Sequence, residues 1–368
     1  MLFLETRRDT LLKPLQAAVG VVDRKQTLPI LSNVLITPDG ARTAVVATDL
    51  ELQLTSWVDE APAAQDAITV SARKLYDICR SLPENQVLRM ELEGEQLKIR
   101  SGRSRFVLQT LPAADYPRLQ LPEGEGLSLS LPQSRLRHLI SRVQYAMAVQ
   151  DIRYYLNGML LSVLGDRLVV AATDGHRLAL DATGLDEPVE QGMDVILPRK
   201  TVLELYKLLG DGDEPLQLHL SRAQVVFRQA QFELRSKVVD GKFPDYQRVI
   251  PTGYEKSITL GRQLLQQALA RTAILTNDKY RGVRLALTHD SLRLSCSNTE
   301  QEEAQEELEV AYDKEPLDIS FNVQYLQDVL ANLECNAVQM SFGDASSSML
   351  MTIPGEEHFR YIVMPMRI

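Results

Sequence analysis

The sequence predicts an α+β fold in which one structural unit is repeated three times along the chain. Three observations predict it: the length, the balance of residue types, and the recurrence of similar segments in the same order. At 368 residues the chain exceeds what a single hydrophobic core usually serves, so two or three domains are expected. Apolar residues make up 45% and charged residues 24%, which is the balance of a folded globular protein.

Each third of the chain opens with an amphipathic segment typical of a helix and contains a second such segment further on. The matched residues Leu11, Leu136 and Leu264 recur at spacings of 125 and 128 residues. Apolar residues three or four positions apart in these segments indicate helices with one buried face. The segments expected to be helical are 7–20, 71–82, 133–148, 198–209, 262–275 and 322–333.

Alternating runs typical of strands lie between these helices. Thr48, Thr173 and Asn298 fall within three such runs, 125 residues apart each time. Recurrence of order, period and local sequence predicts three tandem α+β units, each with a sheet that carries its helices on one face. We expect the boundaries in the Pro/Gly/Glu-rich segment 121–126 and in 251–256, which gives domains 1–125, 126–254 and 255–368.

Basic residues gather in the expected helices, although the whole chain is acidic with a net charge of −9. The six helical segments hold 14 Lys or Arg against 4 Asp or Glu, which leaves a net charge of −19 for the remainder. If the helices share one face, that face is a positive surface where phosphates could release counterions. Basic residues on ordinary solvated helix faces would give the same counts, and the segment 322–333 carries none, so both interpretations stay open.

Three motifs resemble catalytic or metal sites, and each has a simpler structural interpretation. Ser71 to Lys74 fits the S-x-x-K pattern of penicillin-binding enzymes, but the companion motifs are absent, so a helix N-cap is favoured. Thr173–Arg177 contains a lone histidine beside an aspartate without a nearby nucleophile, which favours an Asp-Gly hairpin. The segment 210–215 lacks the twelve-residue calcium pattern and is expected to be a polar turn. We therefore expect no enzymatic activity, no cofactor and no metal.

The remaining composition favours a cytoplasmic protein. The cysteines Cys79, Cys296 and Cys335 lie far apart and are odd in number, so we expect them to be reduced and buried. No apolar run approaches the roughly 20 residues that a membrane-spanning helix needs, and the N-terminus does not have the pattern of a signal peptide.

Specific strings along the full length closely resemble the bacterial sliding clamp family, the β subunits of DNA polymerase III. These strings are LLKPLQ, TLPILSN, RSGRSRF, LPAADYP, QDIRYYLNGM, ATDGHRLA, VDGKFPDYQRV, RGVRL, EQEEA and YIVMPMRI. The resemblance implies three DNA-clamp domains per chain and a homodimeric ring with sheets outside and helices lining the hole. It also implies a processivity factor in DNA replication and repair that encircles duplex DNA without reading its sequence.

The resemblance further implies sites for DNA and for short linear peptides of partner proteins. The partners expected are the DNA polymerase III α subunit, the clamp-loader δ subunit, other polymerases and repair proteins. DNA contact is expected from Arg24, Arg73, Gln150, Arg153, Tyr154, Tyr155, Arg199 and Lys200. Peptide contact is expected from Leu156, Thr173, Gly175, His176, Arg177, Leu178, Pro244, Arg248, Val249, Tyr280, Asn322, Tyr325, Ser346, Ser348, Ile362, Val363, Met364, Pro365, Met366 and Arg367.

Three departures from the family pattern bear on the peptide site. The family often has phenylalanine where Tyr280 stands and valine where Ser346 and Ile362 stand. These differences change the polarity of the site. Aliphatic and methionine side chains can nevertheless repack around different apolar anchors, which suits a surface that binds many peptides.

Ring closure is expected to join the first domain of one chain to the third domain of its partner. The resemblance places Phe106 on an edge strand against Ile274 and Leu275 of the partner chain, and basic residues against acidic ones around them. Pairing of edge strands would supply backbone hydrogen bonds, and the charges would set orientation. The charged residues expected at this interface are Lys74, Arg103, Arg105, Glu300, Glu302, Glu303 and Glu306.

Two other functions compete with this interpretation. A nucleic-acid-binding module that does not form a ring predicts strong, salt-dependent direct binding to DNA, whereas a clamp predicts weak direct binding. A hydrolase that uses Ser71 or His176 predicts turnover that is lost when either residue is replaced by alanine.

Overall fold

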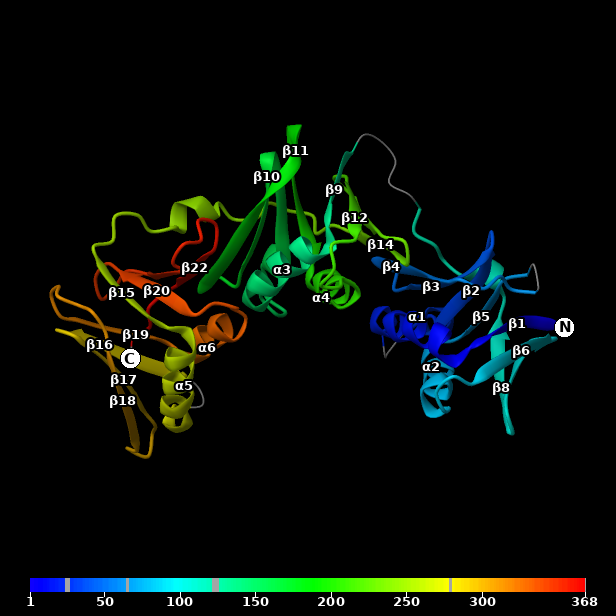
Figure 1. Ribbon diagram of the computed structural model, residues 1–368, viewed down its shortest axis with the longest axis horizontal. Coiled ribbons are helices and arrows are strands. Elements are labelled where there is room, and N and C mark those ends of the chain that lie inside the picture. Colours follow the sequence, from blue (N-terminus) through cyan, green and yellow to red (C-terminus); the bar gives the residue numbers. More distant parts are fainter. Residues whose placement is uncertain (24–26, 64–65, 121–125, 278–279, 368) are drawn as a thin grey trace. The chain divides into compact units, whose positions relative to one another are not determined.

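A computed structural model describes residues 1–23, 27–63, 66–120, 126–277 and 280–367 of the chain (Figure 1). Its described residues belong to two compact units: unit 1 is Met1–Ser134 with Lys200–Val238, and unit 2 is Arg135–Arg199 with Val239–Ile368. Both units combine helices and sheets, so the α+β class is confirmed. The central third contributes to both units, and the two predicted domain boundaries stay a prediction.

Helices form where the sequence predicts them. Within the described ranges they are α1 (Arg8–Val21), α2 (Ala72–Ser81), α3 (Gln133–Val143), α4 (Arg199–Leu208), α5 (Arg262–Thr272) and α6 (Val323–Ala331). The predicted match of Leu264 with Leu11 and Leu136 is wrong by one position. Leu264 is 48% exposed, whereas Leu265 is fully buried like Leu11 and Leu136. The helices themselves begin at Arg8, Gln133 and Arg262, so the third copy is shifted by one residue relative to the predicted alignment.

The first residue of α1 and of α5 caps the second helix of the same third of the chain. The Nε atom of Arg8 donates to the carbonyl of Cys79 at 2.8 Å, next to the end of α2. Arg262 donates in the same way to the carbonyls of Leu330 and Cys335, at and beyond the end of α6. Carbonyls at the C-terminal end of a helix have no partner within the helix, so these guanidinium groups stabilise both helix ends.

Unit 1 contains one twelve-stranded sheet within the described residues, and α1 and α2 pack side by side next to it (Figure 1). Its order is β1-β6-β7-β8-β5-β2-β3-β4-β14-β13-β12-β9. The strands are β1 (Leu2–Arg7), β2 (Asn33–Asp39), β3 (Arg42–Thr48), β4 (Leu52–Val58), β5 (Ile68–Ser71), β6 (Val87–Glu93), β7 (Gln96–Ser101), β8 (Ser104–Leu111), β9 (Leu127–Pro132), β12 (Pro215–Leu220), β13 (Gln224–Arg228) and β14 (Phe232–Lys237).

Unit 2 contains two sheets over the residues described: a six-stranded one, β10-β11-β22-β21-β20-β15, and a four-stranded one, β18-β17-β16-β19. Strand β22 pairs with β11 and so joins the last segment of the chain to its central third. The strands are β10 (Gly158–Thr173), β11 (Arg177–Pro198), β15 (Lys256–Gly261), β16 (Gly282–Thr288), β17 (Ser291–Ser297), β18 (Glu303–Glu309), β19 (Leu317–Asn322), β20 (Ala337–Phe342), β21 (Met349–Thr352) and β22 (Arg360–Val363).

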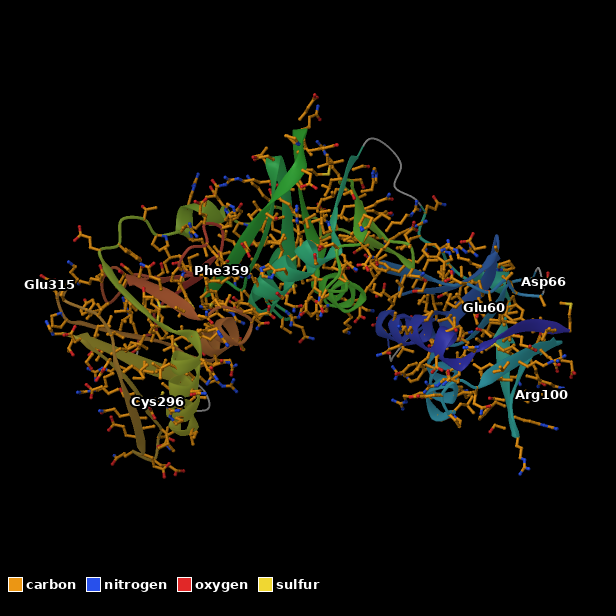
Figure 2. The ribbon with its side chains drawn as sticks, in the orientation of Figure 1. Glu60, Asp66, Arg100, Cys296, Glu315 and Phe359 are labelled. Atoms are coloured by element: carbon orange, nitrogen blue, oxygen red, sulfur yellow. The ribbon has the colours of Figure 1, made fainter. Side chains whose placement is uncertain are left out.

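A buried ion pair holds α3 to its sheet in unit 2. Arg142 is 5% exposed and donates to Asp181 of β11 at 3.1 Å and to Glu356. Its guanidinium lies 5.6 Å from the ring centroid of Phe359, which is fully buried. Phe359 is labelled in Figure 2. Because a buried charge is costly without partners, the two carboxylates allow Arg142 to sit in this core.

The predicted repeat is visible in one turn of each third of the chain. The hydroxyls of Thr48 and Thr173 donate to the carbonyl four residues further on, at 2.9 and 2.6 Å. Asn298, at the third equivalent position, bonds to Glu302 through its backbone and its side chain. The 125-residue period therefore marks a conformation that is repeated as well as a sequence.

Several smaller expectations can be compared with the structure. Ser71 accepts a hydrogen bond from the Lys74 backbone at 3.5 Å and is the N-cap of α2, as predicted. Cys79 and Cys296 are buried and unpaired, whereas Cys335 is only half-buried. In the part of the chain that the structure describes, no helix is long and apolar enough to cross a membrane.

Candidate functional site

An apolar pocket of unit 2 lies where β11 meets β22. It has a volume of about 220 Å³ and is lined mainly by apolar side chains. Its floor continues into a buried cluster that contains Leu160, Leu178, Phe243 and Ile362. The lining residues are Arg153, Tyr155, Leu156, Thr173, Gly175, His176, Arg177, Leu178, Pro244, Asp245, Tyr246, Val249, Ser348, Ile362 and Met364. Most of the residues predicted to contact peptide are therefore together in one cavity.

A tight turn between β10 and β11 forms one wall of the pocket. Asp174 accepts hydrogen bonds from the backbone of His176 at 2.9 Å and of Arg177 at 3.1 Å, and Thr173 accepts one from Gly175. Gly175 has φ +90°, which side chains other than glycine rarely adopt. The predicted Asp-Gly hairpin is confirmed, and it presents backbone and the His176 side chain to the cavity.

Arg177 holds this turn from behind. Only 9% of its side chain is exposed, and it donates to Asp174 at 3.1 Å, to Asp328 at 2.6 Å and to the carbonyl of Tyr145 at 2.6 Å. Its guanidinium also stacks on the ring of Tyr325, 4.4 Å from the centroid. Burial lowers the pKa of Arg177, but surrounding groups, among them the Asp328 carboxylate, outweigh burial and raise the pKa overall. Arg177 therefore stays charged and fixed at every ordinary pH.

The opposite wall comes from the last strand and the segment after it. Leu178 and Ile362 face each other across the β11–β22 pair, and the backbone of Met364 donates to the carbonyl of His176 at 2.9 Å. Met364 is 49% exposed at the pocket rim. Regular strand pairing thus positions the buried side chains of Leu178 and Ile362 beneath the flexible thioether of Met364.

The rim of the pocket carries an ion pair that the sequence did not assign to it. Arg153 donates to Asp151 at 3.0 and 2.9 Å and also lines the cavity. Its bonds to Asp151 lower the pKa of that carboxyl to about 2. Asp245 and Tyr246 line the pocket as well and were not predicted, although they lie inside the string VDGKFPDYQRV. Adjacency to Pro244 was the signal that could have identified them.

Several predicted peptide-contact residues lie outside this cavity. Tyr280, Met366 and Arg367 line a second, polar hollow of about 950 Å³ over β16, β17 and β19. Asn322 accepts a hydrogen bond from the Gln324 backbone as the N-cap of α6, and Tyr325 packs on Arg177. The other predicted residues absent from the lining of the apolar pocket are Arg248, Ser346, Val363 and Pro365. Their contact with peptide stays a prediction.

The residues predicted to contact DNA differ in how available they are. Arg73, Gln150 and Tyr154 are exposed, while Arg153 and Tyr155 line the apolar pocket. Arg24 lies outside the described residues.

Arg199 and Lys200 are already engaged within the protein. Arg199 is half-buried and donates to the carbonyl of Met147 at 3.3 Å. Lys200 bonds to Asp23 and Asp49 at 2.7 and 2.5 Å, so its charge is largely neutralised. Contact of the exposed residues Arg73, Gln150, Arg153 and Tyr154 with phosphate stays a prediction.

Four of the residues predicted at the dimer interface, Arg105, Phe106, Glu303 and Glu306, lie on the edge strands β8 and β18. Strand β8 pairs with β5 only through Thr110 and Leu111, so its earlier part has an unpaired edge among the described residues. Strand β18 ends the four-stranded sheet and pairs with β17 on one side. Phe106 is half-buried on β8, while Ile274 is 76% exposed close to α5. Lys74, Arg103, Arg105, Glu300, Glu302 and Glu303 are exposed, Leu275 is half-buried, and Glu306 is bonded to Arg271 of its own chain.

Comparison with known proteins identifies the family. Residues 2–120, 130–245 and 247–367 match the N-terminal, central and C-terminal domains of the DNA polymerase III β subunit. The chain is 47% identical over 366 residues to the β sliding clamp of Pseudomonas putida, covering 98% of this chain and 99% of that one. It is 44% identical over 362 residues to the Escherichia coli K12 β sliding clamp, with 98% of each chain covered.

Solved structures agree with the sequence comparison. The DNA polymerase III β subunit of Pseudomonas aeruginosa matches over 100% of both chains with a TM-score of 0.94 and 46% identity. A Bartonella birtlesii sliding clamp bound to griselimycin matches over 100% of both chains with a TM-score of 0.95 and 36% identity. Three tandem clamp domains are thereby established for this fold, and the chain belongs to the family of bacterial β sliding clamps, the β subunits of DNA polymerase III.

Proposed function

We propose that this sliding clamp acts as a homodimeric ring around duplex DNA and captures partner proteins through the apolar pocket between β11 and β22. The pocket is the observation that carries the proposal. It combines buried aliphatic walls, a rim of charged groups and the hydrogen-bonded 174–176 turn. A cavity of about 220 Å³ accommodates one or two large apolar side chains, as a short linear peptide would supply.

Peptide binding can be tested by adding a charge at the pocket rim. Met364→Glu places a carboxylate beside Ile362 and Leu178, and we expect affinity for a fluorescent peptide from a polymerase α subunit to fall at least about tenfold. Leu164→Glu is the matched control, because Leu164 is 70% exposed in the same unit and does not line the pocket. Fluorescence anisotropy measures both. Equal affinity of the Met364→Glu variant and the wild-type protein would remove the pocket as the binding site.

The ring is closed by the open edges of β8 and β18 from two different chains. Exposed Arg103 and Arg105 on one edge complement exposed Glu300, Glu302 and Glu303 on the other. Each exposed ion pair contributes only about 0–1 kcal/mol, so strand pairing and the apolar contact of Phe106 with Ile274 carry most of the interface.

Dimer formation is tested by sedimentation at micromolar concentration. Ile274→Asp puts a charge on the apolar contact and should shift the wild-type dimer to monomer. Leu264→Asp is the control, because Leu264 is also exposed close by on α5 but was not assigned to the interface. A wild-type protein that sediments only as monomer rules out the proposed dimer.

Contact with DNA is through phosphates and independent of sequence, from exposed residues such as Arg73, Gln150 and Tyr154. A loaded ring should stay on circular DNA and slide off a linear molecule. Equal loss from both would favour the competing module that binds DNA without encircling it. The salt dependence of DNA binding also distinguishes the ring from this module. The module requires strong, salt-dependent direct binding to DNA, whereas the ring requires only weak direct binding.

The clamp acts as a non-catalytic accessory subunit in the cytoplasm, where it tethers the polymerase α subunit, the clamp-loader δ subunit and repair proteins. Ser71 supports this assignment because its hydroxyl serves as the N-cap of α2. His176 supports it because it belongs to the wall of the peptide pocket. Hydrolytic turnover that disappears on Ser71→Ala or His176→Ala would contradict it.

A further inference from the structure

Helix α6 carries an acidic residue that faces the back of the peptide pocket. Asp328 accepts a hydrogen bond from the Nη1 atom of Arg177 at 2.6 Å through one oxygen. Its other oxygen accepts from the side chain of Gln324 at 2.8 Å, one turn earlier on the same helix. About a quarter of the Asp328 side chain is exposed, and it is not among the residues that line the pocket.

A continuous series of bonds leads from Asp328 to the pocket wall. Arg177 is held by Asp328 on one side and donates to Asp174 on the other, at 3.1 Å. Asp174 in turn fixes the backbone of His176 and Arg177. The wall formed by Gly175 and His176 is thus anchored to α6 through two carboxylates and one guanidinium.

The surroundings of Arg177 leave it few alternatives to this arrangement. Its Nη2 atom is used by the carbonyl of Tyr145, and its flat face lies on the ring of Tyr325. The hydroxyl of Tyr361 donates to the backbone carbonyl of Tyr325 at 2.9 Å, which fixes that region of α6. A guanidinium enclosed in this way keeps its orientation only while each of its fixed acceptors is present.

We propose that Asp328 is a positioning residue for peptide binding, which orients Arg177 and through it the 174–176 turn without touching the peptide. The inference rests on the proposed function of the apolar pocket. It also accounts for a feature of the sequence: α6 has no Lys or Arg, and its one acidic residue neutralises a buried arginine.

The test measures peptide affinity of the full-length chain by fluorescence anisotropy, with a peptide from a polymerase α subunit as the probe. Asp328→Asn keeps the size of the side chain and removes its charge, and we expect affinity to fall about 5- to 10-fold. Asp328→Glu restores the charge and should recover part of the loss. Asp186→Asn is the matched control, because Asp186 forms an ion pair with Arg135 in the same unit and lines neither the apolar pocket nor the second hollow.

Two further measurements separate positioning from a general loss of stability. Gln324→Ala frees one oxygen of Asp328 but keeps its charge, and a smaller fall of about twofold is expected. The imidazole NMR signals of His176 should shift in Asp328→Asn and stay unchanged in Asp186→Asn. If the wild-type protein binds the peptide and Asp328→Asn binds it equally well, the inference is overturned. If the wild-type protein does not bind the peptide, the proposed function itself fails.

Discussion

Two seams in this molecule are built from the same parts, and only their side chains differ. The first seam is the β4–β14 pair in unit 1, and the second is the β11–β22 pair in unit 2. Each follows a turn that opens with Thr-Asp, at Thr48 and at Thr173, and is closed by the same threonine hydrogen bond. The backbone therefore does not explain why the apolar pocket belongs to the second seam.

Polar contacts hold the segment that crosses the first seam. The side chain of Gln53 accepts from the backbone of Leu119 at 2.8 Å, and Arg235 donates to the carbonyl of Leu119 at 2.9 Å. The hydroxyl of Tyr116 lies 3.2 Å from the backbone carbonyls of Asn33 and Val46, which share its single hydrogen. These bonds draw the crossing segment down onto the sheet.

Apolar residues stand at the matched positions of the second seam. Leu178 lies 125 residues after Gln53, and Phe243 replaces Tyr116 in the corresponding extended segment. Neither side chain can make the hydrogen bonds of its counterpart, and Pro244 and Val249 line the cavity that results. Loss of the polar contacts thus turns a shared structural seam into a binding pocket.

The largest expected difference concerns the cation that holds each turn. Arg177→Met leaves the carboxylates of Asp174 and Asp328 without their buried partner, so we expect unfolding free energy to fall by about 3 kcal/mol and peptide binding to be lost. Lys200→Met breaks a more exposed pair with Asp49 and should cost about 1 kcal/mol. Urea unfolding followed by circular dichroism measures both, and equal losses would contradict the comparison.

Exchange of the matched residues Gln53 and Leu178 tests the polar contacts directly. Leu178→Gln buries an amide in the apolar cluster beneath the pocket, which should lower the free energy of unfolding by about 2 kcal/mol. It should also remove most of the peptide affinity. Gln53→Leu leaves the backbone N–H of Leu119 without its acceptor, which should lower the free energy of unfolding by about 1 kcal/mol. It should not alter peptide affinity. Thermal unfolding and anisotropy report the two effects. A Gln53→Leu variant that binds peptide less tightly would show that the seams are coupled.

Substitution of the residue at the centre of each turn should change stability less than the substitutions above. Gly175 has φ +90°, and a Cβ added there would lie 2.9 Å from the guanidinium of Arg153. Gly175→Ala should cost about 1 kcal/mol and displace Arg153 from the rim. Leu50 occupies the matched position with φ +79°, so Leu50→Gly removes strain and should change stability by less than about 1 kcal/mol, in the favourable direction. Destabilisation by Leu50→Gly, measured as a lower melting temperature, would show that the Leu50 side chain matters more than its backbone.

How much the sequence could predict follows from the same two seams. Periodicity located the helices, and the 125-residue spacing located equivalent turns, because both depend on local patterns. The apolar pocket required the pairing of β11 with β22, which joins residues about 180 positions apart and has no local signature. The resemblance to sliding clamps supplied that information for Leu178 and Ile362.

Resemblance was less informative about what each side chain does. Tyr325 and Asn322 are expected to contact peptide, which stays a prediction, and the structure adds that Tyr325 stacks on Arg177 and Asn322 caps α6. Lys200 was expected to contact DNA, and it is paired with two carboxylates of unit 1. Such roles depend on three-dimensional neighbours that a single sequence does not reveal.

The smallest expected difference between the seams is their response to pH. At the second seam, bonds from Arg153 lower the pKa of Asp151 to about 2, so the contribution of this pair is present above the unfolded pKa of about 3.9 and is lost as pH falls through the folded value. At the first seam, burial lowers the pKa of Lys200, but bonds to Asp23 and Asp49 outweigh it and raise the pKa overall. That contribution is present below the unfolded pKa of about 10.4 and is lost as pH rises through the folded value.

Both contributions should therefore be constant between about pH 5 and pH 9. We compare the melting temperature of the wild-type protein with that of each variant. The difference from Asp151→Asn should become smaller only below about pH 4. The difference from Lys200→Met should become smaller only above about pH 10. Differential scanning fluorimetry across this range measures both curves. A Lys200→Met difference that narrowed at acid pH instead would contradict the predicted contrast between the two seams.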